Sequence, residues 1–180
     1  MENSVKTKWG IDPTHSEIAF KVKHLMITNV KGLFKEFDAN ITITNNDFIT
    51  SDIDLNINAA SIETGTADRD AHLRSADFFD VENHNQINFK GKSLEKIDDK
   101  SYTLHGDMTI KGITKTIKLD VEFGGLMKDP WGNEKAGYNI NGKINRKDWG
   151  LNWNAALETG GLLVSDEVKI SCEVQLIKQA

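Results

Sequence analysis

Apolar and polar residues alternate along most of this chain, in runs of roughly eight to eleven positions. In the first run, residues 17–25, Ile18, Phe20 and Val22 are separated by polar or small residues. Successive side chains of a strand point to opposite faces, so each run predicts a strand with one buried face. A twisted sheet of about eight such strands tends to curl and close into a barrel. The interior of a barrel of about eight strands has room for side chains or one small ligand.

The expected strands cover residues 17–25, 33–44, 52–59, 86–93, 101–110, 114–124, 136–144 and 167–177. The alternation fails over residues 64–80, where Thr66 is a suitable N-cap and Asp68 and Asp70 would fall in the first helical turn. One short helical insertion is therefore predicted at about residues 66–76. We expect an all-β, antiparallel, eight-stranded barrel that occupies residues 1–180 as a single domain.

Composition narrows the classes of function. The net charge of -5 argues against a nucleic-acid-binding surface, which needs an excess of lysine and arginine, and against electrostatic adhesion to anionic membranes. No segment approaches the roughly 18 apolar residues of a membrane span and no export signal is visible, which predicts a cytoplasmic protein. The histidines lack metal-ligand spacing, and the single cysteine, Cys172, cannot build a thiolate zinc site. Neither a metal nor another cofactor is expected.

Polar residues beside the apolar face are candidates for contacting the polar end of a ligand. His24 continues the face of Phe20 and Val22, so it is either a hydrogen-bonded structural histidine or an anchor for a ligand head group. A second polar cluster either pins the helix to the barrel rim or forms a lid: Arg69, Asp70, His72 and Arg74, beside Phe78 and Phe79. A cluster of three tryptophans either packs an irregular rim or lines the interior: Trp131, Trp149 and Trp153.

Several segments together resemble the YceI family of lipocalin-like, polyisoprenoid-binding proteins. The resemblance runs from about Trp9 to Ile177, and its segments read WGIDPTHSEIAFKVKHL, VKGLFKEF, SIETGTADRDAHLRSADFFDVENH, INF, GDMTIKGITKTI, DPWGNEKAGY, INRKDWGLNW and DEVKI. The resemblance implies an extended, lipocalin-like antiparallel barrel with a helical insertion. It also implies that the barrel holds a long apolar chain of isoprenoid or fatty-acyl type.

The predicted function is non-enzymatic binding, carriage or storage of a long-chain amphiphile, such as an isoprenoid, an isoprenoid quinone or a fatty-acid derivative. The predicted ligand contacts are Phe20, Val22, His24, Phe37, Ile41, Ile57, Arg69, Phe78, Phe79, Phe89, Met108, Leu119, Val121, Phe123 and Trp149. One alternative is an enzyme acting on a lipid or quinone, with His24 and an Arg69–Asp70 pair as acid–base groups. Another is a solid-core barrel that acts through protein–protein contacts. A homodimer is compatible with each of these functions.

Overall fold

A computed structural model describes residues 4–155 and 163–179 of the protein. Its strands are β1 (Lys6–Ile11), β2 (Glu17–His24), β3 (Thr28–Phe34), β4 (Phe37–Thr44), β5 (Asp47–Asn58), β6 (Ile62–Glu63), β7 (Gln86–Lys96), β8 (Ser101–Ile110), β9 (Ile113–Lys128), β10 (Glu134–Asn145) and β11 (Val164–Lys178). The helix α1 covers Ala67–Arg74, and the 3-10 turns are η1 (Pro13–His15), η2 (Ala59–Ser61) and η3 (Arg146–Trp149).

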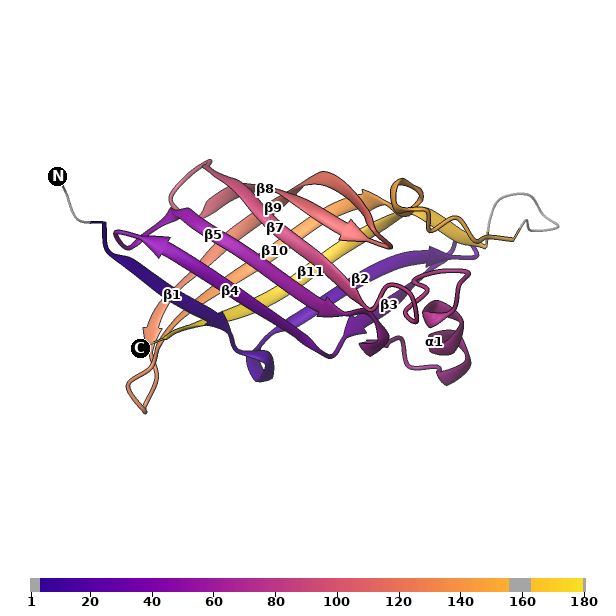
Figure 1. Cartoon of the computed structure of the whole chain (residues 1–180), viewed down its shortest axis with the longest axis horizontal. Coiled ribbons are helices and arrows are strands. Elements are labelled where there is room, and N and C mark those ends of the chain that lie inside the picture. Colours follow the sequence, from indigo (N-terminus) through magenta and orange to yellow (C-terminus); the bar gives the residue numbers. More distant parts are fainter. Residues whose placement is uncertain (1–3, 156–162, 180) are drawn as a thin grey trace.

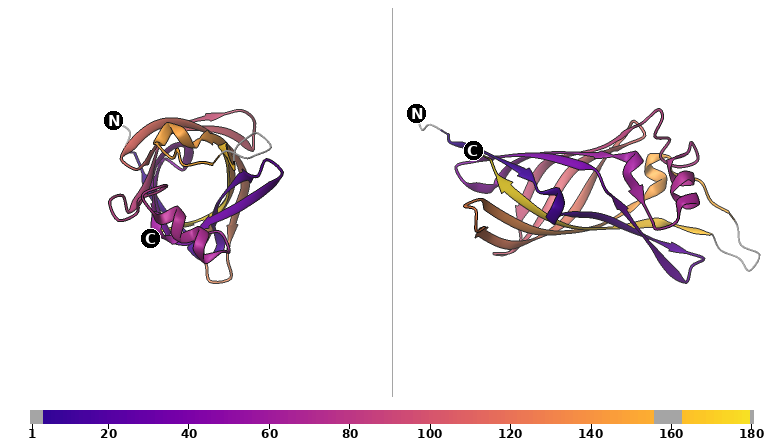
Figure 2. Two further views of the ribbon diagram at one scale, coloured as in Figure 1. Left: turned by 90° about the vertical axis from the view of Figure 1, so that its right-hand side faces the viewer. Right: turned by 90° about the horizontal axis from the view of Figure 1, so that it is seen from below.

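The sheet closes on itself as an antiparallel barrel. Pairing runs in the order β1-β4-β5-β7-β8-β9-β10-β11, and β11 pairs back with β1. The strands form a ring when viewed along the long axis, and α1 lies at one end of it (Figures 1 and 2). These observations confirm the predicted all-β, eight-stranded barrel with one short helix.

Three strands of the barrel are interrupted. β1 and β2 follow one another along β11, with Trp9 opposite Lys178 and Phe20 opposite Ile170. The next strand is also broken in two: β3 pairs with β2, and β4 pairs with β1. The third broken strand consists of β6, which pairs with β3, and β5, which pairs with β4. The run predicted as one strand at residues 33–44 is therefore two strands, and β1 was not predicted at all. Pro13 in η1 lacks an N–H group, which helps to explain the break between β1 and β2.

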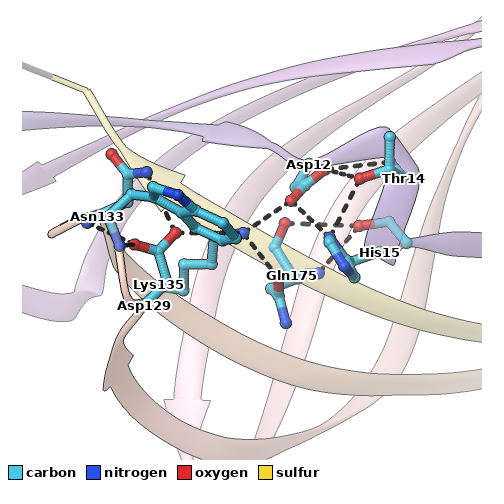
Figure 3. A network of polar contacts seen from close by, with 9 residues as sticks. Asp12, Thr14, His15, Asp129, Asn133, Lys135 and Gln175 are labelled. Atoms are coloured by element: carbon cyan, nitrogen blue, oxygen red, sulfur yellow. Dashed lines mark hydrogen bonds and ion pairs between the residues drawn. The ribbon is translucent and has the colours of Figure 1, made fainter.

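A polar network on the outside of the barrel fixes the β1–β2 break (Figure 3). The Lys135 ammonium lies 3.0 Å from the Asp12 carboxylate and 3.9 Å from that of Asp129, and it donates a hydrogen bond to Gln175. Burial would raise the pKa of Asp12, but hydrogen bonds from His15, Thr14 and Lys135 hold it well below its ordinary value of 3.8. The network thus joins η1 to β10 and β11.

The helix α1 is held by contacts with the segments just before it. The Asp70 carboxylate accepts a hydrogen bond from the Thr64 amide at 2.8 Å and another from its hydroxyl. Arg69 donates to the Thr64 carbonyl at 2.7 Å, and Arg74 donates to the Ala60 carbonyl at 3.0 Å. Thr66 is the N-cap residue, but its side chain makes no capping hydrogen bond. These bonds anchor α1 at the rim of the barrel.

Candidate ligand-binding cavity

Within the described residues, two adjacent cavities lie inside the barrel. The larger, about 420 Å³, lies at the α1 end and is called the outer cavity. Its apolar walls come mainly from β2, β3, β11 and the segment around α1: Ile18, Ala19, Phe20, Val22, Val30, Phe34, Ile57, Leu73, Phe78, Phe79, Ile87, Met108, Ile110, Ile144, Leu151, Trp153, Leu163, Val164, Val168 and Ile170. The inward faces predicted from alternation supply most of this surface.

The smaller inner cavity, about 160 Å³, lies deeper in the barrel. Ile18, Ile57, Ile87, Met108 and Ile170 also line the outer cavity and so form the boundary between the two. The remaining wall is made by Ile11, Ala39, Ile41, Phe48, Ser51, Ile53, Leu55, Phe89, Leu94, Leu104, Leu119, Val121, Tyr138, Ile140, Cys172, Val174 and Leu176. Together the cavities make an elongated apolar space along the barrel.

Polar side chains are concentrated around the outer cavity. They are His24, Thr64, Asp68, Arg69, His72 and Arg146. The His24 ring is half-buried, and no hydrogen bond to it is formed by residues within the described ranges. His72 contacts the Asp77 carboxylate at 2.9 Å, and its ring packs edge-on against Phe78 and Trp153. The walls of the outer cavity therefore combine apolar surface with hydrogen-bonding groups.

Arg146 is buried in the wall of the outer cavity, where it ties a loop to β11. Its guanidinium donates to the carbonyls of Leu151, Trp153, Val164 and Ser165. Burial lowers the pKa of Arg146, and this effect is opposed by the Asp166 carboxylate 3.8 Å away. The many carbonyl contacts indicate that Arg146 mainly maintains the shape of the cavity.

The inner cavity contains few polar groups. The Tyr138 hydroxyl is buried and has no hydrogen-bond partner among the residues that the structure covers. Burial raises the pKa of Tyr138 well above its ordinary value of 10.0, and nearby Tyr102 adds to this effect. Burial likewise raises the pKa of the Cys172 thiol to about 11. The surroundings of the inner cavity thus disfavour charge.

The fold and the cavities can now be compared with known proteins. A family model described as the YceI-like domain matches residues 9–176. The chain belongs to the YceI-like family.

Curated relatives match this YceI-like protein along nearly its whole length. The UPF0312 protein SERP2314 of Staphylococcus epidermidis is 41% identical over 170 residues, which is 94% of this chain and 96% of that protein. The UPF0312 protein SA2479 of Staphylococcus aureus is 39% identical with the same coverage. The relationship therefore includes the strands and the α1 insertion together.

Solved structures agree with the YceI-like fold. The Campylobacter jejuni YCEI protein is 35% identical and has a TM-score of 0.76, with 89% of this chain and 91% of that chain covered. A polyisoprenoid binding domain from Saccharophagus degradans is 14% identical, with a TM-score of 0.73 and coverage of 95% and 98%. At 14% identity the second similarity concerns the fold alone.

Most of the ligand contacts predicted from the sequence line one of the two cavities of this YceI-like barrel. Those lining the outer cavity are Phe20, Val22, His24, Ile57, Arg69, Phe78, Phe79 and Met108. The inner cavity is lined by Ile41, Phe89, Leu119 and Val121, and again by Ile57 and Met108. These residues remain proposed ligand contacts, now with a place in the barrel.

Three predicted contacts lie elsewhere. Phe37 packs against the core without lining either cavity, and Phe123 packs against Phe48 and Tyr138. Trp149 is 1% exposed and donates its indole N–H to the Met108 carbonyl at 3.0 Å, so it packs the rim. We therefore remove Phe37, Phe123 and Trp149 from the set of proposed ligand contacts.

The sequence did not identify Arg146 as part of the cavity wall, and it left open whether Trp153 packs the rim or lines the interior. Arg146 continues the inward face of Ile140 and Ile144, just as His24 continues that of Phe20 and Val22. The same signal, a polar residue in phase with an apolar face, could have identified it. Trp153 follows η3 in an irregular segment, where no period indicates its direction.

The enzyme hypothesis assumed that Arg69 and Asp70 form a pair that acts with His24, and the structure does not show this pair among the residues that it describes. Arg69 and Asp70 each bind Thr64, and no ion pair joins them in the described part of the chain. Asp70 does not line the outer cavity, whereas Arg69 does. Within residues 4–155 and 163–179, no group of three His, Cys, Asp or Glu side chains could hold a metal ion. No helix there is long and apolar enough to cross a membrane.

Proposed function

We propose that the protein binds one amphiphile with a long apolar tail and does so without converting it chemically. The tail would occupy the inner cavity and the deeper part of the outer cavity, and the polar end would lie near His24 and Arg69. The ligand classes that suit this arrangement are isoprenoids, isoprenoid quinones and fatty-acyl derivatives. The protein would either carry or store this ligand. We also propose that residues 1–180 form a single domain.

The observation that carries the proposal is an elongated apolar interior whose ionisable wall residues all border the outer cavity, apart from Tyr138 and Cys172. Each buried methylene contributes about 0.8 kcal/mol, so a chain of several carbons can be bound without charge pairing. A compact polar metabolite would leave its hydrogen-bonding groups unpaired against the inner wall. The fold itself is compatible with such a ligand, since a polyisoprenoid binding domain from Saccharophagus degradans has a similar one.

The arrangement of ionisable groups favours binding over catalysis. The ionisable side chains along the outer cavity are His24, Asp68, Arg69, His72 and Arg146. Within the described residues, no two of them are joined by a hydrogen bond or an ion pair. The carboxylate that His72 contacts at 2.9 Å is that of Asp77, which is exposed and does not line the cavity. A general acid–base pair usually needs a partner within hydrogen-bond reach of the group that it serves. The enzyme alternative therefore has less support than binding.

Native mass spectrometry of freshly purified protein, followed by solvent extraction, tests the proposal. We expect one long-chain lipid per chain. Two variants are compared. In the first, Ala39→Phe, a large side chain fills the inner cavity; in the second, the control Asn40→Phe, the same ring lies on the exposed face of β4. The first variant should lose the lipid and the second should keep it. Wild-type protein that carries no lipid and binds no added long-chain lipid would refute the proposal.

A further inference from the structure

The loop between β2 and β3 exposes three consecutive apolar side chains. Leu25, Met26 and Ile27 are 40%, 60% and 77% exposed. The hairpin projects from the α1 end of the barrel, away from the ring of strands (Figures 1 and 2). Large apolar side chains grouped at a projecting tip are a common feature of surfaces that contact a protein or a membrane.

The backbone of this loop is unfavourable for its residues. Leu25 and Met26 have φ values of 53° and 61°, in the left-handed region that glycine and asparagine tolerate best. Two other tight turns of the barrel place asparagine or glycine at positive φ, namely Asn45–Asn46 and Gly112 after Lys111. Leu25 and Met26 are therefore poor choices for the turn itself, and such conflicts are expected where function requires a residue.

A row of lysines crosses the strands that lead to this tip. Lys143 lies opposite Lys169, Lys169 opposite Lys21, and Lys21 opposite Lys31, so the row spans β10, β11, β2 and β3. Lys118 lies near the same row, around one groove with Lys21, Lys143 and Lys169. We call Lys21, Lys31, Lys143 and Lys169 the lysine row.

The lysine row forms few ion pairs, although Asp120 and Asp148 border the same groove. Lys31 contacts the Glu17 carboxylate at 2.7 Å, but Lys21, Lys143 and Lys169 form no ion pair with any residue that the structure covers. Like charges directly opposite each other on neighbouring strands are destabilising. In a chain of net charge -5, this concentration of positive charge on one face indicates an anionic partner.

The tip and the lysine row lie beside the outer cavity. Val22, His24 and Val30 line that cavity from the same two strands that carry the tip. Lys21 precedes Leu25 by four residues, which at about 3.3 Å per residue places the row roughly 13 Å behind the tip. An apolar tip with lysines at this spacing suits insertion into acyl chains with the ammonium groups reaching back to the phosphates.

We propose that the α1 end of the barrel docks on an anionic lipid bilayer, with the β2–β3 tip inserted and the lysine row facing the phosphate groups. The hairpin at the opposite end also exposes apolar residues, Met127 at 76% and Trp131 at 83%. There, however, the lysines have acidic neighbours: Lys135 pairs with Asp12, Lys178 pairs with Glu134 at 3.0 Å, and Lys128 lies opposite Glu134 on β10. Docking is independent of what the cavity holds, whereas direct exchange of a lipid between bilayer and cavity rests on the proposed function.

Co-sedimentation with vesicles tests this proposal. One set of vesicles contains equal parts of phosphatidylglycerol and phosphatidylcholine, and the other contains phosphatidylcholine alone. The wild-type protein should sediment with the anionic vesicles and should be released by added salt. Each lysine near an anionic surface contributes about a fivefold factor to binding, so Lys21→Gln with Lys169→Gln should lower the partition coefficient about 25-fold.

The tip is tested by Leu25→Asn combined with Met26→Gly, residues that suit a left-handed turn. This variant should be at least as stable as the wild type. It should bind anionic vesicles at least about tenfold more weakly, since two of the three exposed apolar side chains are lost and only Ile27 remains. The matched control, Leu126→Asn with Met127→Asn at the opposite end, should bind as the wild type does. Equal binding to both kinds of vesicle, no binding to either, or an equal loss in the control would overturn the proposal.

Mass spectrometry of the same proteins separates this proposal from the proposed function. A tip variant that keeps its cavity lipid but no longer sediments with anionic vesicles supports docking as a separate property. A wild-type protein that contains cavity lipid but ignores anionic vesicles overturns docking and leaves the proposed function intact. If the protein binds anionic vesicles but its cavity takes up no lipid, docking stands and the proposed function is overturned.

Discussion

The outer and inner cavities share strands but differ in what their walls offer a ligand. Around the outer cavity, His24, Arg69 and His72 provide hydrogen-bonding groups among apolar residues. The inner cavity is enclosed by aliphatic and aromatic side chains, and its buried Tyr138 hydroxyl has no partner among the described residues. The inner cavity therefore favours any apolar tail of suitable shape, whereas the outer cavity can distinguish ligands by their polar ends.

The largest expected effect contrasts one aromatic residue from each cavity. Phe89 is buried in the inner wall and its ring covers Gly106, so Phe89→Ala should destabilise the fold by about 3–5 kcal/mol. Phe20 lines the outer cavity and is less buried, so Phe20→Ala should cost about 2 kcal/mol of stability. Phe20→Ala should also weaken lipid binding at least about tenfold, or 1.4 kcal/mol. Urea unfolding and lipid titration measure the two quantities.

Phe123→Ala is the control for that contrast. Phe123 packs on Phe48 and Tyr138 but lines neither cavity, so its truncation should reduce stability and leave lipid affinity nearly unchanged. If Phe123→Ala weakened binding as much as Phe20→Ala, the assignment of contacts by cavity would be wrong.

A smaller effect of pH should separate β1 from β8. Because the pKa of Asp12 is lowered in the folded protein, its contribution to stability is present above pH 3.8 and is lost as the pH falls towards the folded pKa. Asp12→Asn should therefore cost about 1–3 kcal/mol at pH 7, and less in acid. Hydrogen exchange should show β1 losing protection in acid before β8. A difference between variant and wild type that does not change with pH would contradict this account.

His24→Leu tests whether the outer cavity recognises a polar end. No described residue hydrogen-bonds the His24 ring, so the free energy of unfolding should stay within about 0.5 kcal/mol of the wild type or increase. The range of co-purifying lipids should broaden. A loss of about 1–3 kcal/mol with the lipids unchanged would show that His24 is structural instead. Thermal melts with and without added lipid distinguish these outcomes.

The smallest effect is expected for Tyr138→Phe. Removing a buried hydroxyl that lacks a partner relieves its desolvation cost, so stability should stay the same or rise by about 1 kcal/mol. Binding of a purely hydrocarbon tail should not change. A marked loss of stability would mean that the hydroxyl has a hydrogen-bond partner, and the description of the inner cavity would need revision.

Local sequence pattern was sufficient for most of the fold. Period-two alternation located the strands and the helix near their observed positions, because each strand has one buried and one exposed face. It missed β1, a short strand that contains two lysines and Gly10 and is completed by pairing with β4 and β11. It also merged β3 with β4, since the break at residues 35–36 depends on the shape of the whole barrel.

The site was predictable only in part. Alternation indicates which side chains point inward, but it does not indicate where the interior is empty. Phe89 and Phe123 both belong to apolar faces, yet only Phe89 lines a cavity, because Phe48 and Tyr138 pack around Phe123. The inward direction of Arg146 could have been inferred from its phase with Ile140 and Ile144, but the loop carbonyls that it binds have no local signature.

The reactivity of the single cysteine, Cys172, can report whether the inner cavity is occupied. Cys172 lines that cavity, and its raised pKa keeps the thiolate scarce at neutral pH, so alkylation should be slow. A reagent must enter the barrel to reach the sulfur, and a lipid tail in the inner cavity would stand in its way. The rate of thiol labelling should then follow loading and release in real time, without any attached dye.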